Sequence, residues 1–142
     1  MSRDAIERAI PHREPFLLVD EVVEKAGNRI VCRKRFTGEE FWYRGHYPGQ
    51  PLTPGVILCE AAMQAGAVLL ADVVTGQGGV PVVARMNNVK FKTMVQPGDT
   101  IQMEVELTEQ MAGAYFFNAK VSVDGNTAVT LDFVCKMVRE EK

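Results

Sequence analysis

The chain has 142 residues, enough for one domain with a substantial core, and we expect residues 1–142 to form that single domain. Hydrophobic residues make up 46% and charged residues 24%, which is the composition of an ordinary globular protein. The formal net charge of -2 shows no excess of basic residues, so nucleic acid is not an expected partner.

The N-terminal part predicts a short helix followed by a β-hairpin. The first residues are charged where a signal peptide needs an apolar stretch, so we expect a cytoplasmic protein. Ser2 is suited to cap a helix that ends near Ala9. Residues 16–24 and 29–36 have strand character and flank a turn at residues 26–28. The second strand carries a basic series that we interpret as a solvated face, suited also to an acidic carrier protein: Arg29, Arg33, Lys34 and Arg35.

Residues 56–71 predict one long helix, because they contain no proline and many strong helix formers. Pro54 suits its first turn, and Thr53 is the candidate N-cap. Only Glu60 and Gln64 are strongly polar within it, so the helix belongs in the middle of a core. It is shorter than the roughly 20 uninterrupted apolar residues of a membrane span and carries a carboxylate, so we expect no membrane contact.

The second half of the chain predicts strands of an antiparallel sheet. A glycine-rich break at residues 76–79 follows the helix. From Thr100 onward apolar and polar residues alternate, which predicts one buried and one solvated strand face. Asp124 and Gly125 form a favoured two-residue hairpin turn. The strands are expected at residues 82–91, from residue 100, and at 115–123 and 126–138.

These elements predict an α+β domain in which about six largely antiparallel strands surround one long buried helix. A single curved sheet of this size leaves its edge strands open. A second copy of the chain can cover such an edge by pairing strands, so we also predict a dimer.

The candidate site combines His46 with Glu60. His46 lies in a loop whose glycines and prolines restrain the backbone, a common way to hold a reacting group, although most loop histidines are only polar surface residues. Glu60 has apolar sequence neighbours, where a charge is costly unless it is partnered or used. Gln64 lies one turn further along and can hydrogen-bond Glu60, so a structural role suits it at least as well as a catalytic one.

The other potentially reactive side chains are predicted to be structural. Cys32, Cys59 and Cys135 are odd in number and lack the spacing of a disulfide framework or zinc site, so we expect three reduced thiols. His12 sits in a proline-restrained segment, and no nearby acid suggests that it is activated. We therefore interpret it as tying down its loop rather than reacting.

Four blocks of the sequence together resemble the FabZ-type 3-hydroxyacyl-[acyl-carrier-protein] dehydratases, and they occur in the same order over nearly the whole chain. The resemblance implies a hotdog fold, in which a sheet wraps a central helix, and dimers that often assemble into hexamers. It also implies a role in fatty-acid synthesis without cofactor or metal. The blocks lie in residues 11–20, 45–49, 54–64 and 88–99.

The same resemblance implies that His46 and Glu60 are the catalytic pair and that different subunits of the dimer supply them to each site. A related dehydratase-isomerase family has aspartate where Glu60 stands, so glutamate favours a plain dehydratase. Departures from the usual pattern at Tyr47, Cys59 and residues 62–63 affect the expected acyl tunnel and leave the chain-length preference open.

Dehydration of a 3-hydroxyacyl thioester needs a base for the proton next to the carbonyl and an acid for the departing hydroxyl. A neutral imidazole suits His46 to the first role, and Glu60 is expected to fill the second. The free N–H groups at the start of the long helix are expected to bind the thioester oxygen. The expected partner is acyl carrier protein with its phosphopantetheine-linked acyl chain. The predicted substrate-binding residues are Gly55, Val56, Gln64, Tyr47 and Pro54.

Two other functions stay open at this level. A hotdog thioesterase would use the carboxylate on the central helix to activate water, but His46 in its Gly-Tyr-Pro-Gly setting argues against it. A subunit that binds thioesters without chemistry would have no need of both His46 and Glu60. The sequence also leaves open whether acyl carrier protein or coenzyme A carries the substrate.

Overall fold

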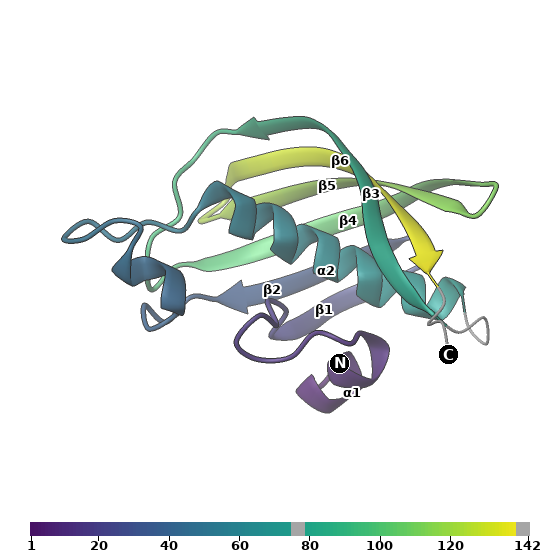
Figure 1. Cartoon of the computed structure of the whole chain (residues 1–142), viewed down its shortest axis with the longest axis horizontal. Helices are drawn as coiled ribbons and strands as arrows, with labels where there is room; N and C mark the ends of the chain where they lie inside the picture. Colours follow the sequence, from purple (N-terminus) through teal and green to yellow (C-terminus); the bar gives the residue numbers. More distant parts are fainter. Residues whose placement is uncertain (75–78, 139–142) are drawn as a thin grey trace.

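A computed structural model describes residues 1–74 and 79–138, and in it a curved antiparallel sheet wraps one long helix (Figure 1). The strand order in the sheet is β1-β2-β4-β5-β6-β3. The helices are α1 (Arg3–Ala9), the 3-10 helix η1 (Phe41–Arg44) and α2 (Gly55–Val73). The strands are β1 (Glu21–Ala26), β2 (Arg29–Arg35), β3 (Val80–Phe91), β4 (Thr100–Met111), β5 (Ala114–Val123) and β6 (Asn126–Val138). This is the predicted α+β arrangement.

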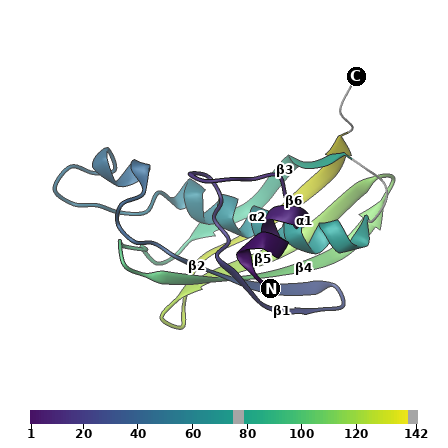
Figure 2. The same cartoon turned by 90° about the horizontal axis from the view of Figure 1, so that it is seen from below.

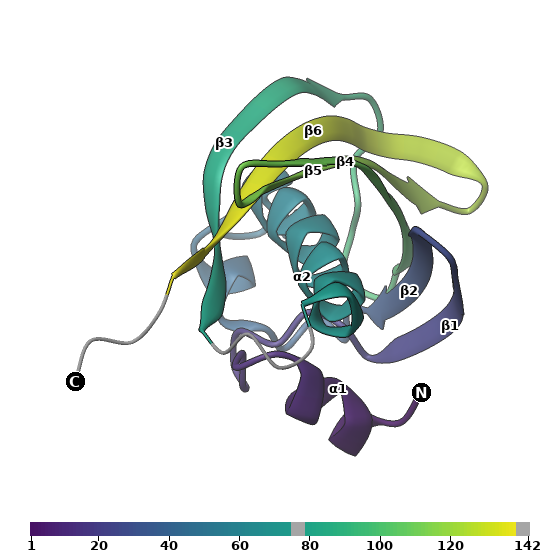
Figure 3. The ribbon, with the colours of Figure 1, turned by 90° about the vertical axis from the view of Figure 1, so that its right-hand side faces the viewer.

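The core lies between the concave face of the sheet and α2. Viewed from its end, the sheet curls over α2, and α1 lies across the side that the sheet leaves open (Figure 3). From below, α1 crosses in front of α2 (Figure 2), and the two helices are in contact. The Ser2 hydroxyl accepts a hydrogen bond from the Ala5 N–H and so caps α1 as predicted.

Helix α2 is the buried helix that the sequence predicts. By length and composition it could cross a membrane, but 67% of its apolar stretch is buried inside the fold, as expected for a core helix. Small residues let the sheet approach its axis closely. A β-carbon added at Gly66 would lie only 2.8 Å from Cζ of Phe133, whose ring is itself stacked on Phe117 at 4.8 Å between centroids.

The predicted N-cap of α2 is wrong. Pro54 occupies the N-cap position, with no side-chain cap hydrogen bond. The Thr53 hydroxyl instead pairs with the Tyr43 hydroxyl at 2.6 Å, and the Thr53 N–H donates to the Val95 carbonyl at 2.9 Å. Thr53 therefore fastens the loop before α2 to its neighbours, and the first N–H groups of the helix stay free of a side-chain cap.

The first strand is shorter than predicted, because β1 begins only at Glu21. The Asp20 N–H still donates to the Arg33 carbonyl of β2 at 2.9 Å, but the backbone of Phe16 and Leu18 is bonded to a side chain instead of a neighbouring strand. The Leu18 N–H donates to Oε1 of Gln64 at 2.7 Å, and Nε2 of Gln64 donates to the Phe16 carbonyl at 2.8 Å. A buried glutamine on α2 thus takes the place of a ladder partner.

The C-terminal half agrees closely with the sequence pattern. Ile101, Met103, Val105 and Leu107 alternate into the core along β4, as predicted. The β5–β6 hairpin turns at Asp124 and Gly125, which both have positive φ (50° and 79°), as the tight hairpin turn requires. Strand β3 also agrees, although it starts two residues before the predicted Val82. Most of the predicted break at residues 76–79 lies outside the described residues.

Replacing Gly66 by alanine tests the close approach of the sheet to α2. Helix propensity alone would favour alanine by about 1 kcal/mol. The collision with the buried, stacked Phe133 ring should outweigh that gain and destabilise the protein by about 1–3 kcal/mol, measured as a lower melting temperature. Gly45→Ala is the matched control, since nothing lies within 4 Å of a β-carbon there. Equal melting temperatures for Gly66→Ala and the unchanged protein would contradict this packing.

Candidate active site

The loop after η1 holds the His46 ring in one orientation. The His46 N–H donates to the Trp42 carbonyl at 3.0 Å, and the Leu52 N–H donates to the His46 carbonyl at 2.9 Å. Nδ1 of the ring lies 2.9 Å from the Leu52 carbonyl oxygen. A carbonyl only accepts hydrogen bonds, so Nδ1 carries the proton and Nε2 keeps a free lone pair. The imidazole is thus presented as a base.

A pocket of about 420 Å³ adjoins this ring at the start of α2. Phe91, at the end of β3, covers the first turn so closely that a β-carbon at Gly55 would lie 2.6 Å from its Cε1. Within residues 1–74 and 79–138, neither the Gly55 nor the Val56 N–H donates to a protein acceptor. The lining residues are His46, Leu52, Thr53, Gly55, Val56, Leu58, Phe91, Lys92, Thr93, Met94 and Val95.

The remaining predicted binding residues flank this pocket or lie further along α2. Tyr47 stacks on the His46 ring with centroids 4.1 Å apart. Pro54 is the N-cap of α2, directly before Gly55. Glu60 and Gln64 are not among the pocket-lining residues. The structure of one chain therefore brings His46, Gly55 and Val56 to one pocket and leaves Glu60 outside its lining.

The Glu60 carboxyl group is held on the side of α2 that faces the N-terminal segment. Nε2 of Gln64 donates to its Oε2 at 3.0 Å. Gln64 itself is 1% exposed, and its amide also binds the backbone of Phe16 and Leu18. The hydrogen bond between Gln64 and Glu60 that the helical spacing suggested is confirmed, while a contact of Gln64 with substrate stays a prediction.

His12 has an acid beside it, contrary to the sequence-based interpretation. Its Nε2 lies 3.7 Å from Oε2 of Glu60, and its Nδ1 is buried with no hydrogen-bond partner among the described residues. Burial lowers the pKa of His12, with Glu60 raising it and Arg13 lowering it to smaller extents. Sequence reasoning missed this contact because the two residues are far apart in the chain, and no local spacing signals it.

The cysteines are unsuited to nucleophilic catalysis. All three are buried and free of disulfides, as predicted. Burial raises the pKa of Cys32 and of Cys135 to about 12 and also raises the pKa of Cys59. Because the thiolate is the reactive form, these thiols are inert at neutral pH.

The basic residues of β2 are solvated as interpreted at Arg33 and Arg35, which are exposed, but not at Lys34. Lys34 is only 7% exposed, and its ammonium lies 3.3 Å from Oδ1 of Asp20. Arg33 lies 3.5 Å from Glu21, and Arg29 lies 3.4 Å from Glu104. These pairs leave Lys34 as part of the structure and not as a docking group.

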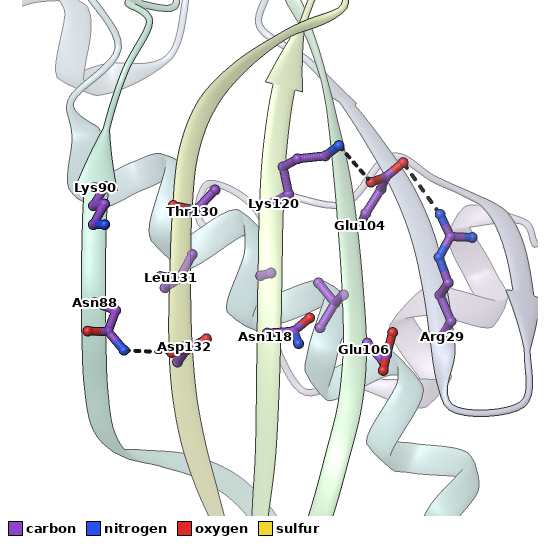
Figure 4. Close-up of a pocket in the computed structure, with 12 residues that line it drawn as sticks. Arg29, Asn88, Lys90, Glu104, Glu106, Asn118, Lys120, Thr130, Leu131 and Asp132 are labelled. Atoms are coloured by element: carbon purple, nitrogen blue, oxygen red, sulfur yellow. Dashed lines mark hydrogen bonds and ion pairs between the residues drawn. The ribbon is translucent and has the colours of Figure 1, made fainter.

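A second, polar hollow of about 330 Å³ lies on the outer face of the sheet (Figure 4). Its charged groups mostly pair with one another, as Arg29 and Lys120 both approach Glu104. Asn88 donates to Asp132 at 2.8 Å across the same surface. The residues that line this polar hollow include no base with a free lone pair and no unpaired helix N–H group. The His46 pocket is therefore the better candidate for chemistry.

Comparison with known proteins gives a consistent family. Residues 10–132 match the family described as FabA-like domain. The 3-hydroxyacyl-[acyl-carrier-protein] dehydratase FabZ of Clostridium perfringens is 40% identical over 128 residues, which are 90% of this chain and 92% of that protein. The FabZ dehydratase of Staphylococcus aureus is 40% identical over 128 residues, covering 89% of this chain and 88% of that one.

Solved structures show the same fold at low identity. The dehydratase heterocomplex ApeI:P from Xenorhabdus doucetiae superposes with a TM-score of 0.78 at 17% identity, over 95% of this chain and 91% of the other. A hypothetical thioesterase with coenzyme A from Streptococcus pneumoniae gives a TM-score of 0.65 at 10% identity, over 98% and 95%. The expected hotdog fold is thereby confirmed.

The Tyr43–Thr53 hydrogen bond should matter for stability, since both residues are buried. Thr53→Val should leave the Tyr43 hydroxyl unpaired and cost about 1–3 kcal/mol in the free energy of unfolding. Tyr43→Phe combined with Thr53→Val removes both polar partners, so the double variant should be more stable than Thr53→Val alone. Denaturant unfolding of the two single variants and the double variant measures this, and strictly additive losses would contradict the contact.

Proposed function

The chain belongs to the FabA-like family, and from that premise we propose that it is a FabZ-type dehydratase that converts a (3R)-hydroxyacyl thioester on acyl carrier protein to the trans-2-enoyl thioester. The reaction serves fatty-acid synthesis in the cytoplasm. The observation that carries the proposal is the His46 ring, oriented by the Leu52 carbonyl beside two unpaired helix N–H groups.

His46 supplies the base. Its Nε2 takes the proton from the carbon next to the thioester carbonyl, while Nδ1–H remains bound to the Leu52 oxygen. As this proton leaves, negative charge develops on the thioester oxygen. The N–H groups of Gly55 and Val56 receive that charge at the positive end of α2. The Phe91 ring occupies the place of a side chain at Gly55, so the thioester would reach these N–H groups alongside that ring.

Glu60 supplies the acid. Its proton goes to the hydroxyl on the third carbon as that carbon–oxygen bond breaks, so water leaves and the enoyl double bond forms. Glu60 then holds a negative charge and His46 a positive one, and both groups are reset when His46 releases its proton to solvent and Glu60 takes one up. The hydrogen bond that Nε2 of Gln64 donates to Oε2 of Glu60 at 3.0 Å supports this role, because it holds the carboxyl group in place on α2.

A homodimer would bring the two groups to one site. Strand β3 is an edge of the sheet and pairs only with β6 among the described strands. Val82, Val83 and Met86 along it are exposed, which is costly for an open edge and supports pairing with a second copy. Phe91, at the end of β3, lines the pocket, so a partner at this edge lies next to the site. Each pocket would then use its own His46 and the Glu60 of the partner.

Single substitutions test these roles. His46→Ala and Glu60→Gln should each lower the hydration rate of a crotonyl thioester on acyl carrier protein by roughly 10²–10⁴-fold, because each removes one proton transfer. The melting temperatures should stay close to that of the unchanged protein. Lys120→Gln, on the outer face of the sheet, is the control and should keep full activity.

The same assay separates the alternatives. Near-normal hydration by either variant would remove that residue from the mechanism. Release of free thiol without enoyl product would identify a thioesterase. Tight thioester binding with no turnover by the unchanged protein would identify a binding subunit. Comparing acyl carrier protein with coenzyme A as carrier, over several chain lengths, identifies the substrate.

A further inference from the structure

The two oxygens of the Glu60 carboxyl group have different surroundings. Oε2 accepts a hydrogen bond from Nε2 of Gln64 at 3.0 Å and lies 3.7 Å from Nε2 of His12. Oε1 makes no hydrogen bond in the part of the chain that the structure describes. A carboxylic acid carries its proton on one oxygen only, and the Gln64 N–H on Oε2, with the His12 ring beside it, leaves Oε1 as the oxygen for that proton.

The His12 ring has only one useful hydrogen-bonding position. Its Nδ1 is buried without a partner, so a proton there would be an unsatisfied buried donor. That tautomer would also turn the lone pair of Nε2 toward an oxygen of Glu60. The other tautomer puts the proton on Nε2, where it points to Oε2 of Glu60. The surroundings of His12 therefore favour the form that donates to Glu60.

His12 is not needed to anchor its own segment. The Arg13 guanidinium donates to the carbonyls of Glu7 and Ile10, each at 2.8 Å. The Phe16 N–H donates to the Arg13 carbonyl at 2.8 Å, and Gln64 binds Phe16 and Leu18 on the far side. The segment is thus fixed on both sides of His12, which leaves the Glu60 contact as the function of the ring.

We propose that His12 is a positioning residue that, together with Gln64, holds Oε2 of Glu60 and so keeps the transferable proton on Oε1, turned toward the substrate hydroxyl. The inference rests on the function proposed above and adds one residue and one atom to it. A distance of 3.7 Å is longer than a full hydrogen bond, and catalytic contacts of this kind commonly tighten when substrate binds.

The charges around the pair agree with this role. Glu60 faces His12 from α2, and Arg13 faces it from its own segment. A negative charge on Glu60 also raises the pKa of the Cys135 thiol on β6. Because burial dominates and lowers the pKa of His12, the ring is neutral at neutral pH and acts as an N–H donor. Without it, the Gln64 amide alone holds Oε2, and the carboxyl group turns more readily to present the wrong oxygen.

Paired substitutions at His12 test the proposal by kinetics. His12→Leu removes the donor and should lower kcat by about 10- to 100-fold with little change in KM, because the thioester is held elsewhere. His12→Gln carries an amide N–H that reaches the place of Nε2, so it should restore most of kcat. Thermal unfolding of both variants monitors the fold. Equal losses of kcat in the two variants, or a loss confined to KM, would overturn the proposal.

A double variant shows whether His12 acts through Glu60. In a Glu60→Gln background the acid is already absent, so adding His12→Leu should lower the residual rate no further. A further loss of the same size as in the unchanged background would show that His12 acts independently of Glu60, and would overturn the proposal.

The protonation of His12 can be measured without a catalytic assay, because the chain contains only two histidines, His12 and His46. In untagged His46→Ala protein, His12 is the sole imidazole, and its ¹⁵N chemical shifts should report a proton on Nε2. Adding Glu60→Gln should lower the pKa of His12, because the ionised form of the Glu60 carboxyl group, which raises that pKa, can no longer form beside the ring. An unchanged titration would refute the contact. If the unchanged protein had no dehydratase activity but His12 showed the expected titration, the proposed function would be refuted and the contact between His12 and Glu60 would stand.

Discussion

The side-chain amide of Gln64 joins three parts of this molecule that are far apart in the sequence. Its oxygen accepts from the Leu18 N–H, and its nitrogen donates to the Phe16 carbonyl and to Glu60. These bonds satisfy the N-terminal segment where the β-ladder has not yet begun, and they give the carboxyl group on a buried helix a partner. Glu60 can therefore be kept in an otherwise apolar helix, with His12 beside it.

The opposite end of the site is built by backbone. The Leu52 carbonyl sets the His46 ring, and Thr53 fastens the same loop to Tyr43 and Val95. Because Thr53 is used in this way, the start of α2 keeps its free N–H groups for a ligand. His46 and these N–H groups thus share one pocket, while Glu60 lies further along the helix, outside that pocket's lining. This separation within one chain supports a site shared between two chains.

Features that depend on local pattern could be predicted from the sequence, and those that depend on distant side-chain contacts could not. Alternation along β4 and the Asp124-Gly125 turn are local, and both are confirmed. The backbone before β1 is bonded to Gln64, 46 residues from Leu18, which no local pattern signals. The Tyr43–Thr53 and His12–Glu60 contacts arise only when the chain folds. His46 and Glu60 were identified from their unusual surroundings and the family resemblance, but no local pattern says whether one chain or two would supply them to a site.

Mixing His46→Ala chains with Glu60→Gln chains tests most directly whether each site combines residues from two chains. Co-expression of His46→Ala and Glu60→Gln chains with different tags yields mixed dimers, each with one intact site if the pair comes from different chains. When the chains mix at random, the total should recover about a quarter of the unmutated activity, since half of the dimers are mixed and half of their sites are intact. Activity no higher than that of either variant alone, in confirmed mixed dimers, would contradict the shared site.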